Sequence, residues 1–207
     1  MGRTGYGGFK VLDKDLLELG IKFHGHRCPA MPIGLRAGEL AMGKLGVKRS
    51  QDKELFCFME IGPAHATMCF GDGVQTATGC TYGKGNIERL NYGKNAITLI
   101  DVKGRKAVRV VVNPEFQKKA LASTFVQMRK EGIAPQDIDP AIVDPLIENV
   151  LKQPDDVLFK VSDVFDYDMK PKKGTFEYHE CERCGEVVFS YGMRIKDGKL
   201  VCITCSE

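Results

Sequence analysis

Two histidines and a cysteine alternate in the segment "FHGHRCPAMPIG", residues 23 to 34, at a spacing that suits a shared metal ion. Alternate side chains of an extended segment lie on one face, and in an irregular loop they still stay close together. Imidazole nitrogen and thiolate sulfur are ligands that zinc and other transition metals take. We therefore expect His24, His26 and Cys28 to share a cation. The alternative is a histidine that caps backbone groups beside a small buried cysteine.

Cys28 directly precedes Pro29, and proline is favoured at the first position of a helix. Free N–H groups and the macrodipole at a helix N-terminus stabilise a thiolate, which is the form that binds metals and attacks electrophiles. We therefore expect Cys28 to be a better ligand or nucleophile than an ordinary thiol.

A second polar stretch is "CFGDGVQTATGCTYGKGN", residues 69 to 86. Its glycines allow a left-handed backbone and a close approach of a ligand to N–H groups. It is not a Walker A loop, because glycine follows the lysine where Ser or Thr would bind Mg²⁺. A connecting turn with an exposed lysine is the alternative reading. Its candidate site residues are Cys69, Asp72, Gln75, Cys80, Lys84 and Asn86.

The last cysteines form two C-x2-C pairs separated by seventeen residues, "CERCGEVVFSYGMRIKDGKLVCITC". This spacing is typical of a tetrahedral zinc site, in which each pair directs two thiolates at one ion. The Asp197-Gly198 dipeptide between the pairs predicts a hairpin. Four protein thiolates fill the coordination sphere, so we expect structural zinc here; two disulfides or a redox dithiol pair are the alternatives. The predicted ligands are Cys181, Cys184, Cys202 and Cys205.

Hydrophobic periodicity predicts helices and strands that interleave along the first 168 residues. We expect a helix capped by Asp13 and ended by Gly20, and a second from Pro29 or Pro32 to Leu45. Small residues along the second helix predict close packing against a sheet. A short helix near Asp72 is expected as well. The remaining elements are strands at 55–62, at 96–101 and 106–112 around Gly104, and at 157–164, with helices at 115–131 and 140–152.

Composition supports a globular protein with a normal hydrophobic core, since 43% of its 207 residues are hydrophobic and 28% are charged. We expect two domains, 1–168 and 169–207, joined by the polar stretch around Pro171 and Gly174. The net charge of +3 disfavours nucleic acid as a partner. There is no apolar run long enough to span a membrane, so we expect a cytoplasmic protein.

The two motifs together, "FHGHRCPAMPIG" and "CFGDGVQTATGCTYGKGN", resemble the formylmethanofuran dehydrogenase E-subunit family over residues 10 to 165. The resemblance implies an α+β fold, with a thioredoxin-like mixed-sheet core flanked by helices and a small C-terminal treble-clef zinc finger. It also implies other subunits of a molybdenum or tungsten enzyme of one-carbon metabolism as partners. The metal-binding active site that it implies comprises His24, His26, Cys28, Cys69, Asp72, Gln75 and Cys80.

The first functional hypothesis is a zinc-binding accessory protein of that one-carbon pathway. A catalytic zinc site has three protein ligands and one open position, and we expect His24 or His26, Cys28 and Cys80 as ligands. His24, His26, Cys28 and Cys80 are the predicted catalytic residues, and Cys69 is a further predicted metal ligand. Zinc or another transition metal is the expected core cofactor. The residues expected to bind a small or anionic ligand are Asp72, Gln75, Lys84 and Asn86.

Two other hypotheses remain open. One is a zinc-finger module that binds a protein or nucleic acid, with a non-catalytic core. The other is a thiol redox protein, which the absence of C-x-x-C from the first 180 residues disfavours. A homodimer is the default expectation for either.

Overall fold

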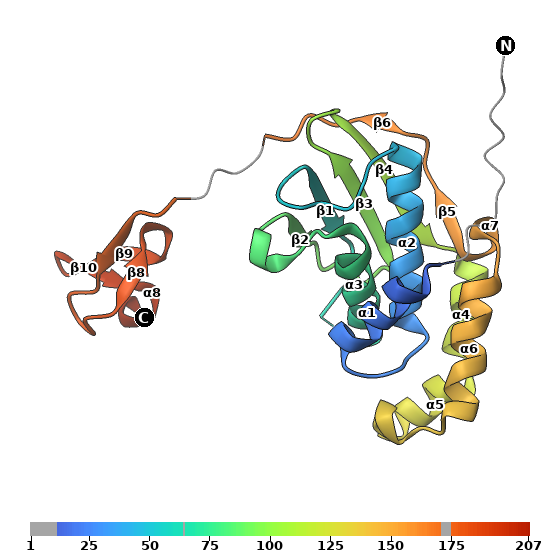
Figure 1. Cartoon of the computed structure of the whole chain (residues 1–207). Helices are drawn as coiled ribbons and strands as arrows, with labels where there is room; N and C mark the ends of the chain where they lie inside the picture. The colour runs from blue at the N-terminus through green and yellow to red at the C-terminus, as the bar shows by residue number, and fades with distance from the viewer. Residues whose placement is uncertain (1–11, 64, 171–174) are drawn as a thin grey trace, which may run out of the picture. The chain divides into compact units, whose positions relative to one another are not determined.

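The computed structural model describes residues 12–63, 65–170 and 175–207. It divides the chain into two compact units, a core unit, Met1–Lys170, and a C-terminal unit, Pro171–Glu207 (Figure 1). Pro171 and Gly174 of the predicted linker lie outside the described residues. Among the helices that are described, none is both long and apolar enough to cross a membrane.

A mixed sheet forms the base of the core unit, in the order β2-β1-β3-β4-β5, with β6 also paired to β4. β1 and β2 run parallel, and the other neighbours are antiparallel. The prediction of an α+β mixed sheet is therefore confirmed. Its strands are β1 (Leu55–Met59), β2 (Ile87–Arg89), β3 (Ala96–Asp101), β4 (Lys106–Val112), β5 (Phe159–Val161) and β6 (Phe165–Asp166).

Helix α1 spans Lys14–His24, longer than predicted. Asp13 caps it, accepting a hydrogen bond from the backbone N–H of Asp15 at 3.0 Å. Gly20 does not end the helix, because its missing side chain leaves room for Met31: a Cβ there would lie 2.8 Å from the Met31 sulfur. The helix ends instead at Gly25, whose φ of 89° is left-handed. His24 consequently lies in the last helical turn, and the loop that follows carries His26.

Helices α2 (Ala30–Leu45) and α3 (His65–Thr78) cross in close contact over the sheet (Figure 1). Glycines make the contact possible, since a Cβ at Gly34 would lie 2.0 Å from the Phe70 carbonyl oxygen. A Cβ at Gly73 would lie 2.1 Å from the Met31 carbonyl oxygen. The small residues of α2 therefore face α3, and not a sheet as predicted. This crossing holds the first turn of α2 beside the middle of α3.

The predicted helix at 115–131 is two helices, α4 (Pro114–Leu121) and α5 (Thr124–Lys130). The chain breaks between them because Ser123 caps α5, accepting a hydrogen bond from the Val126 N–H at 3.4 Å. The 3-10 turns η1 (Tyr82–Lys84) and η2 (Pro135–Asp137) and the helices α6 (Pro140–Lys152) and α7 (Asp155–Leu158) complete the core unit.

Two large hydrophobic clusters fill the core unit. The first lies between the sheet and helices α2 and α3, and it includes Cys57 and Cys80. The second joins α1, α2 and α3 to α5 and α6, and it includes Cys28 and Cys69. The four cysteines of this unit are thus divided between two separate clusters.

The C-terminal unit consists of two short hairpins and one helical turn. Asp197 and Gly198 have φ angles of 53° and 77° at the turn between the later strands, which confirms the hairpin predicted there. Its elements are β7 (Tyr178–Glu180), β8 (Val187–Phe189), η3 (Ser190–Gly192), β9 (Met193–Lys196), β10 (Lys199–Cys202) and α8 (Ile203–Ser206).

Candidate metal centres

Four side chains of the core unit bring potential metal-binding atoms within 4.8 Å of one another: those of His24, His26, Cys28 and Cys69. His24 comes from the last turn of α1, and His26 and Cys28 come from the loop that leads into α2. Cys69 lies on α3. We call these four residues the core centre. Three elements therefore build it, and the α2–α3 crossing joins them.

The distances inside the core centre suit a tetrahedral ion. His24 Nε2 lies 3.1 Å from His26 Nε2 and 3.4 Å from Cys28 Sγ. For zinc bonds of usual length, a tetrahedron places two nitrogens about 3.3 Å apart and a nitrogen and a sulfur about 3.6 Å apart. The donor set and its spacing therefore fit zinc, with both histidines presenting Nε2 to the same point.

Asp72 holds the His24 ring from the opposite side. Its Oδ2 lies 2.8 Å from His24 Nδ1, and Gln75 Nε2 donates to Asp72 Oδ1 at 3.4 Å. An Nδ1–H that donates to a carboxylate leaves Nε2 as the lone-pair nitrogen, which is the usual arrangement behind metal-binding histidines. Asp72 and Gln75 are therefore positioning residues for His24, whereas the sequence predicted direct contact with a cofactor.

Hydrogen bonds set the protonation states within the core centre. The Asp72 carboxylate, followed by Cys69, raises the pKa of His24 from 6.5 to about 9. A hydrogen bond from Cys69, together with the N–H groups of Met31 and Ala30 at the start of α2, lowers the pKa of Cys28. Cys28 and burial raise the pKa of Cys69. The metal-free centre therefore favours a thiolate at Cys28, a thiol at Cys69 and a proton on His24.

Cys80, predicted as a ligand and catalytic residue, does not join the core centre. Helix α3 separates it from Cys69, because the nine residues from Cys69 to Thr78 span about 13 Å of helix axis. Its side chain is fully buried in the first hydrophobic cluster, and burial raises its pKa to about 11. A neutral buried thiol in that position contributes to packing.

Lys84 and Asn86 also lie away from the core centre. Lys84 Nζ donates to the Ser50 carbonyl oxygen at 3.0 Å. Asn86 is fully buried, donates to the carbonyl oxygens of Asp52 and Leu55, and accepts from the Thr81 N–H at 2.9 Å. These bonds tie the glycine-rich loop to the strand before it, so the predicted role in ligand binding is replaced by a structural one.

Comparison with known proteins gives the family. Residues 23–160, two thirds of the chain, match the family described as "FmdE, Molybdenum formylmethanofuran dehydrogenase operon". The chain belongs to the FmdE family. The matched range contains the whole core centre and both of the motifs that carry the resemblance.

Two relatives of this FmdE family chain are informative. A protein of Archaeoglobus fulgidus named "Probable S-adenosyl-L-methionine-binding protein" is 35% identical over 201 residues, which cover 89% of this chain but 50% of the relative. The chain thus spans half the length of that curated relative. A crystal structure of an FmdE-like protein of tungsten formylmethanofuran dehydrogenase, from Syntrophus aciditrophicus, has a TM-score of 0.56 at 20% identity, covering 96% of each chain. That similarity is one of fold.

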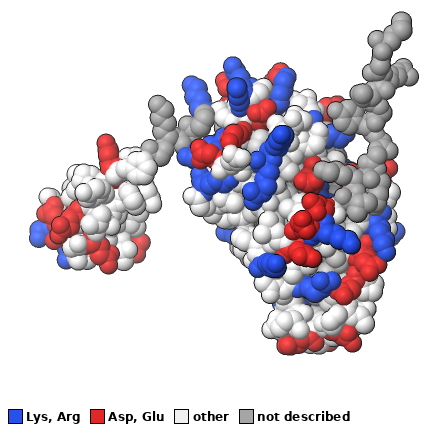
Figure 2. Space-filling view, viewed as in Figure 1, with Lys and Arg blue, Asp and Glu red and all other residues white. Residues whose placement is uncertain are grey.

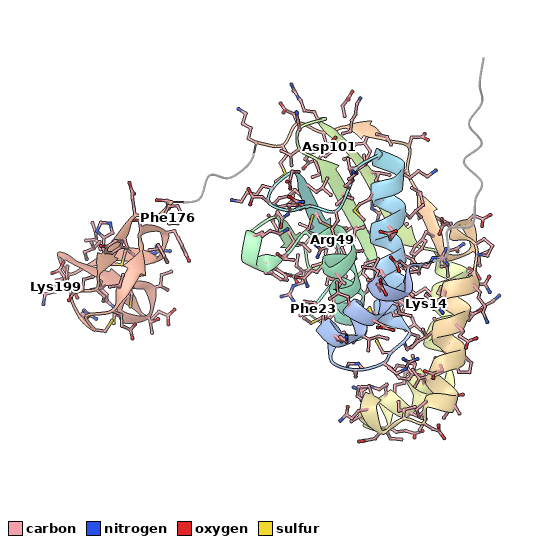
Figure 3. All side chains as sticks on the ribbon, in the orientation of Figure 1. Lys14, Phe23, Arg49, Asp101, Phe176 and Lys199 are labelled. Atoms are coloured by element: carbon pink, nitrogen blue, oxygen red, sulfur yellow. The ribbon has the colours of Figure 1, made fainter. Side chains whose placement is uncertain are left out.

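A cavity of about 750 Å³ adjoins the core centre of the FmdE unit, and His26, Cys28 and Cys69 form part of its wall. The rest of the wall comes from α2, the end of β4 and helices α4, α5 and α6. Figure 1 shows α6 beside α2 on the side away from α3. Lys14 and Phe23 mark the two ends of α1 in Figure 3, and Phe23, next to His24, remains 57% exposed. The sequence did not predict this cavity, because residues from four separate helices line it.

The C-terminal unit contains the second metal centre. Its four ligand sulfurs lie within 4.8 Å of one another, with Cys184 and Cys202 Sγ 4.0 Å apart. N–H groups point at the sulfurs as in a zinc knuckle: Cys202 N–H donates to Cys181 Sγ at 3.2 Å. Backbone N–H groups of Cys184 and Cys202 lower the pKa of Cys181 to about 6. The predicted four-cysteine cluster, Cys181, Cys184, Cys202 and Cys205, is confirmed as a candidate metal site.

Proposed function

We propose that this FmdE family chain is a zinc-binding accessory protein of a formylmethanofuran dehydrogenase system. The core centre holds one ion through His24, His26, Cys28 and Cys69. The observation that carries the proposal is the pair of contacts on His24, with Asp72 at Nδ1 and the other donors at Nε2. A histidine oriented in this way is typical of metal sites and has no comparable role in a packing cluster.

The core centre can hold zinc with three or four protein ligands, and Cys69 decides between them. Its raised pKa makes it the donor that most easily stays a thiol. Zinc with three protein ligands keeps an open position, where it acidifies bound water toward ~7 and polarises carbonyl groups. His26, Cys28 and Cys69 face the cavity, so a small molecule in the cavity would reach that position.

The C-terminal ion has a structural role in this proposal. A unit of fewer than 40 residues buries too little apolar surface to fold alone, and four thiolates leave no open position. The two hairpins followed by the short helix α8 support the treble-clef assignment. In the core, the β1-α3-β2 unit followed by the β3–β4 hairpin supports the thioredoxin-like assignment.

Partners follow from the family and from surface charge. We propose other subunits of a molybdenum or tungsten enzyme as partners, together with a homodimer of this chain. Both are tested by co-purification and by light scattering. Figure 2 shows Lys and Arg interspersed with Asp and Glu on the visible face of the core unit. A face of mixed charge supports protein partners over nucleic acid.

The relative from Archaeoglobus makes S-adenosylmethionine a second candidate ligand. The identity of 35% over most of this chain favours it. Because the chain spans half of that relative, the ligand can also belong to the other half. Calorimetric titration of the zinc-loaded chain with S-adenosylmethionine tests the candidate, and heat without saturation would remove it.

The thiol redox hypothesis also has one observation in its favour, because Cys28 and Cys69 are hydrogen-bonded although no C-x-x-C joins them. Loss of zinc would leave this pair free to form a disulfide. Mass spectrometry of the zinc-loaded chain separates the two hypotheses. Metal binding predicts both thiols reduced and zinc present, whereas a redox role predicts a reversible Cys28–Cys69 disulfide and no core zinc.

Metal analysis of the full-length chain tests the proposal. We expect about two zinc ions per chain, and about one after His26→Ala/Cys28→Ala or after Cys184→Ser/Cys205→Ser. Cys80→Ala is the matched control and should keep both ions. A zinc content that the His26/Cys28 double variant does not lower would contradict the core centre.

A further inference from the structure

We propose that the cavity beside the core centre binds a small molecule with an uncharged, apolar body and a metal-binding head group. The inference rests on the proposed function, since the ion supplies the partner for the head group. It goes further in assigning the chemistry of the ligand and the place of each of its parts.

The cavity has the size and surface of a small-molecule site. Its volume of about 750 Å³ falls within the ~300–1,000 Å³ that such sites occupy. Apolar side chains from α2, β4, α4, α5 and α6 dominate the wall. Those used in the argument are Ala30, Ile33, Val112, Phe116, Phe125 and Val150. A ligand that fills this space removes apolar surface from water on both partners, which favours binding.

Charge distribution excludes an ionised body. The charged side chains of the wall are two acidic and two basic, so they give no net field: Glu115, Asp156, Lys119 and Arg129. Glu115, Asp156 and Lys119 are exposed and lie at the rim. Arg129 is committed to the carbonyl oxygen of Ile133. A charge in the interior of the cavity would lose its hydration without a buried partner, at a cost of several kcal/mol.

The position of the core centre defines the other part of the ligand. His26, Cys28 and Cys69 belong to the same wall as the apolar residues, so a molecule that fills the cavity touches both. A head group such as a carbonyl, thiol or hydroxamate could then bind the ion while the body lies between α2 and the α4–α6 helices. S-adenosylmethionine fits this description poorly, because its sulfonium and amino-acid charges would meet the apolar wall.

Two hydroxamic acids test the inference by isothermal titration of the zinc-loaded, full-length chain. Acetohydroxamate carries the head group alone, and octanohydroxamate adds six methylenes. Each buried methylene strengthens binding about 4-fold, so octanohydroxamate should bind at least about 50-fold more tightly even if half of the chain is buried. S-adenosylmethionine is a third arm and should bind more weakly than octanohydroxamate.

A matched pair of variants locates the body of the ligand. Ala120 lines the cavity from α4, whereas Ala122, two residues later, is exposed and lies outside the wall. Ala120→Phe should remove most of the chain-length dependence and leave acetohydroxamate binding unchanged. Ala122→Phe should change neither. Both side chains are at least partly exposed, so both variants should fold, and thermal melting verifies this.

The outcomes separate the cavity from the ion. Equal affinity for the two hydroxamates, or a chain-length dependence that Ala120→Phe leaves intact, would overturn the assignment of the cavity. Failure of the chain to retain core zinc would overturn the proposed function and the head-group part of the inference. In that case the octanohydroxamate titration of the metal-free chain still decides whether the cavity takes an apolar body.

Discussion

Asp72 Oδ2 lies 2.8 Å from His24 Nδ1, so a carboxylate in the middle of α3 fixes the orientation of a ring on the last turn of α1. The bond joins residues 48 positions apart in the sequence. It points His24 Nε2 at His26 and Cys28, which gathers the donors before any ion arrives. The core centre is thereby preorganised, and the position of Asp72 on α3 is the reason.

Substitution of Asp72 should weaken core zinc without unfolding the chain. Asp72→Asn keeps the shape but loses the charge that stabilises the Nδ1–H tautomer, and such changes lower metal affinity about 10- to 100-fold. Chelator competition measures the effect. Asp166→Asn, at an exposed position paired with Lys106, is the control and should have no effect. Unchanged zinc affinity in Asp72→Asn would mean that Asp72 does not position a ligand.

Core zinc affinity should rise with pH. The pKa of His24 is raised from 6.5 to about 9, so the metal-free centre holds a proton that zinc must displace. Apparent affinity should therefore increase about 10-fold per pH unit between about 6.5 and 9, and about 100-fold per unit if Cys69 also gives up its proton. Chelator competition on the Cys184→Ser/Cys205→Ser variant, which reports the core ion alone, measures the slope.

The same shift has a consequence for the metal-free protein. Since the folded pKa of His24 lies above the unfolded value, protonated His24 stabilises the fold fully below pH 6.5, and this contribution is lost as pH rises through about 9. A zinc affinity that is flat across this range, or a metal-free form unaffected by the Asp72→Asn change at pH 7, would contradict the assigned protonation.

The α2–α3 crossing should tolerate no side chain at Gly34. A Cβ there would lie 2.0 Å from the Phe70 carbonyl oxygen, so Gly34→Ala must separate the helices. We expect a loss of at least about 2 kcal/mol of unfolding free energy, with weaker core zinc, because the crossing aligns Cys69 with Cys28. Gly43→Ala is the control on the same helix, where a Cβ would meet nothing within 4 Å. Urea unfolding should show Gly43→Ala to be as stable as the wild type or more so.

Cys80 and Cys69 should respond differently to removal of sulfur. Cys80→Ala leaves a small void in the first hydrophobic cluster, so stability should fall by about 1 kcal/mol while core zinc stays. Cys69→Ala should lower core zinc affinity instead. Metal analysis and thermal melting of the two variants distinguish packing from ligation, and loss of core zinc in Cys80→Ala would restore the prediction made from the sequence.

Local signals predicted the parts of the site that lie close together in the chain. The alternating His24, His26 and Cys28 and the proline that follows them were sufficient to predict a metal-binding corner at a helix N-terminus. The C-x2-C pairs predicted the second centre, for the same reason. Helix caps at Asp13 and Gly46 were also readable, because they depend on one residue and its neighbours.

The start of α3 was not predictable in this way, and the error moved the fourth ligand. A helix that begins near Asp72 would leave both Cys69 and Cys80 in loops, equally able to reach the histidines. The actual helix begins at His65, which places Cys69 and Asp72 three residues apart on one face and Cys80 beyond the far end. Gly71 and Gly73 weaken the helical signal, and only the close approach of Ile61 and Met31 explains them.

Zinc K-edge X-ray absorption of the variant with Ser at positions 181, 184, 202 and 205 tests the central claim most directly, because it reports the core ion alone. The predicted spectrum has two nitrogen ligands at about 2.0–2.1 Å and one or two sulfur ligands at about 2.3 Å. Loss of the nitrogen shell in His24→Ala/His26→Ala would complete the assignment. A zinc-free variant, or a shell without histidine nitrogen, would contradict it.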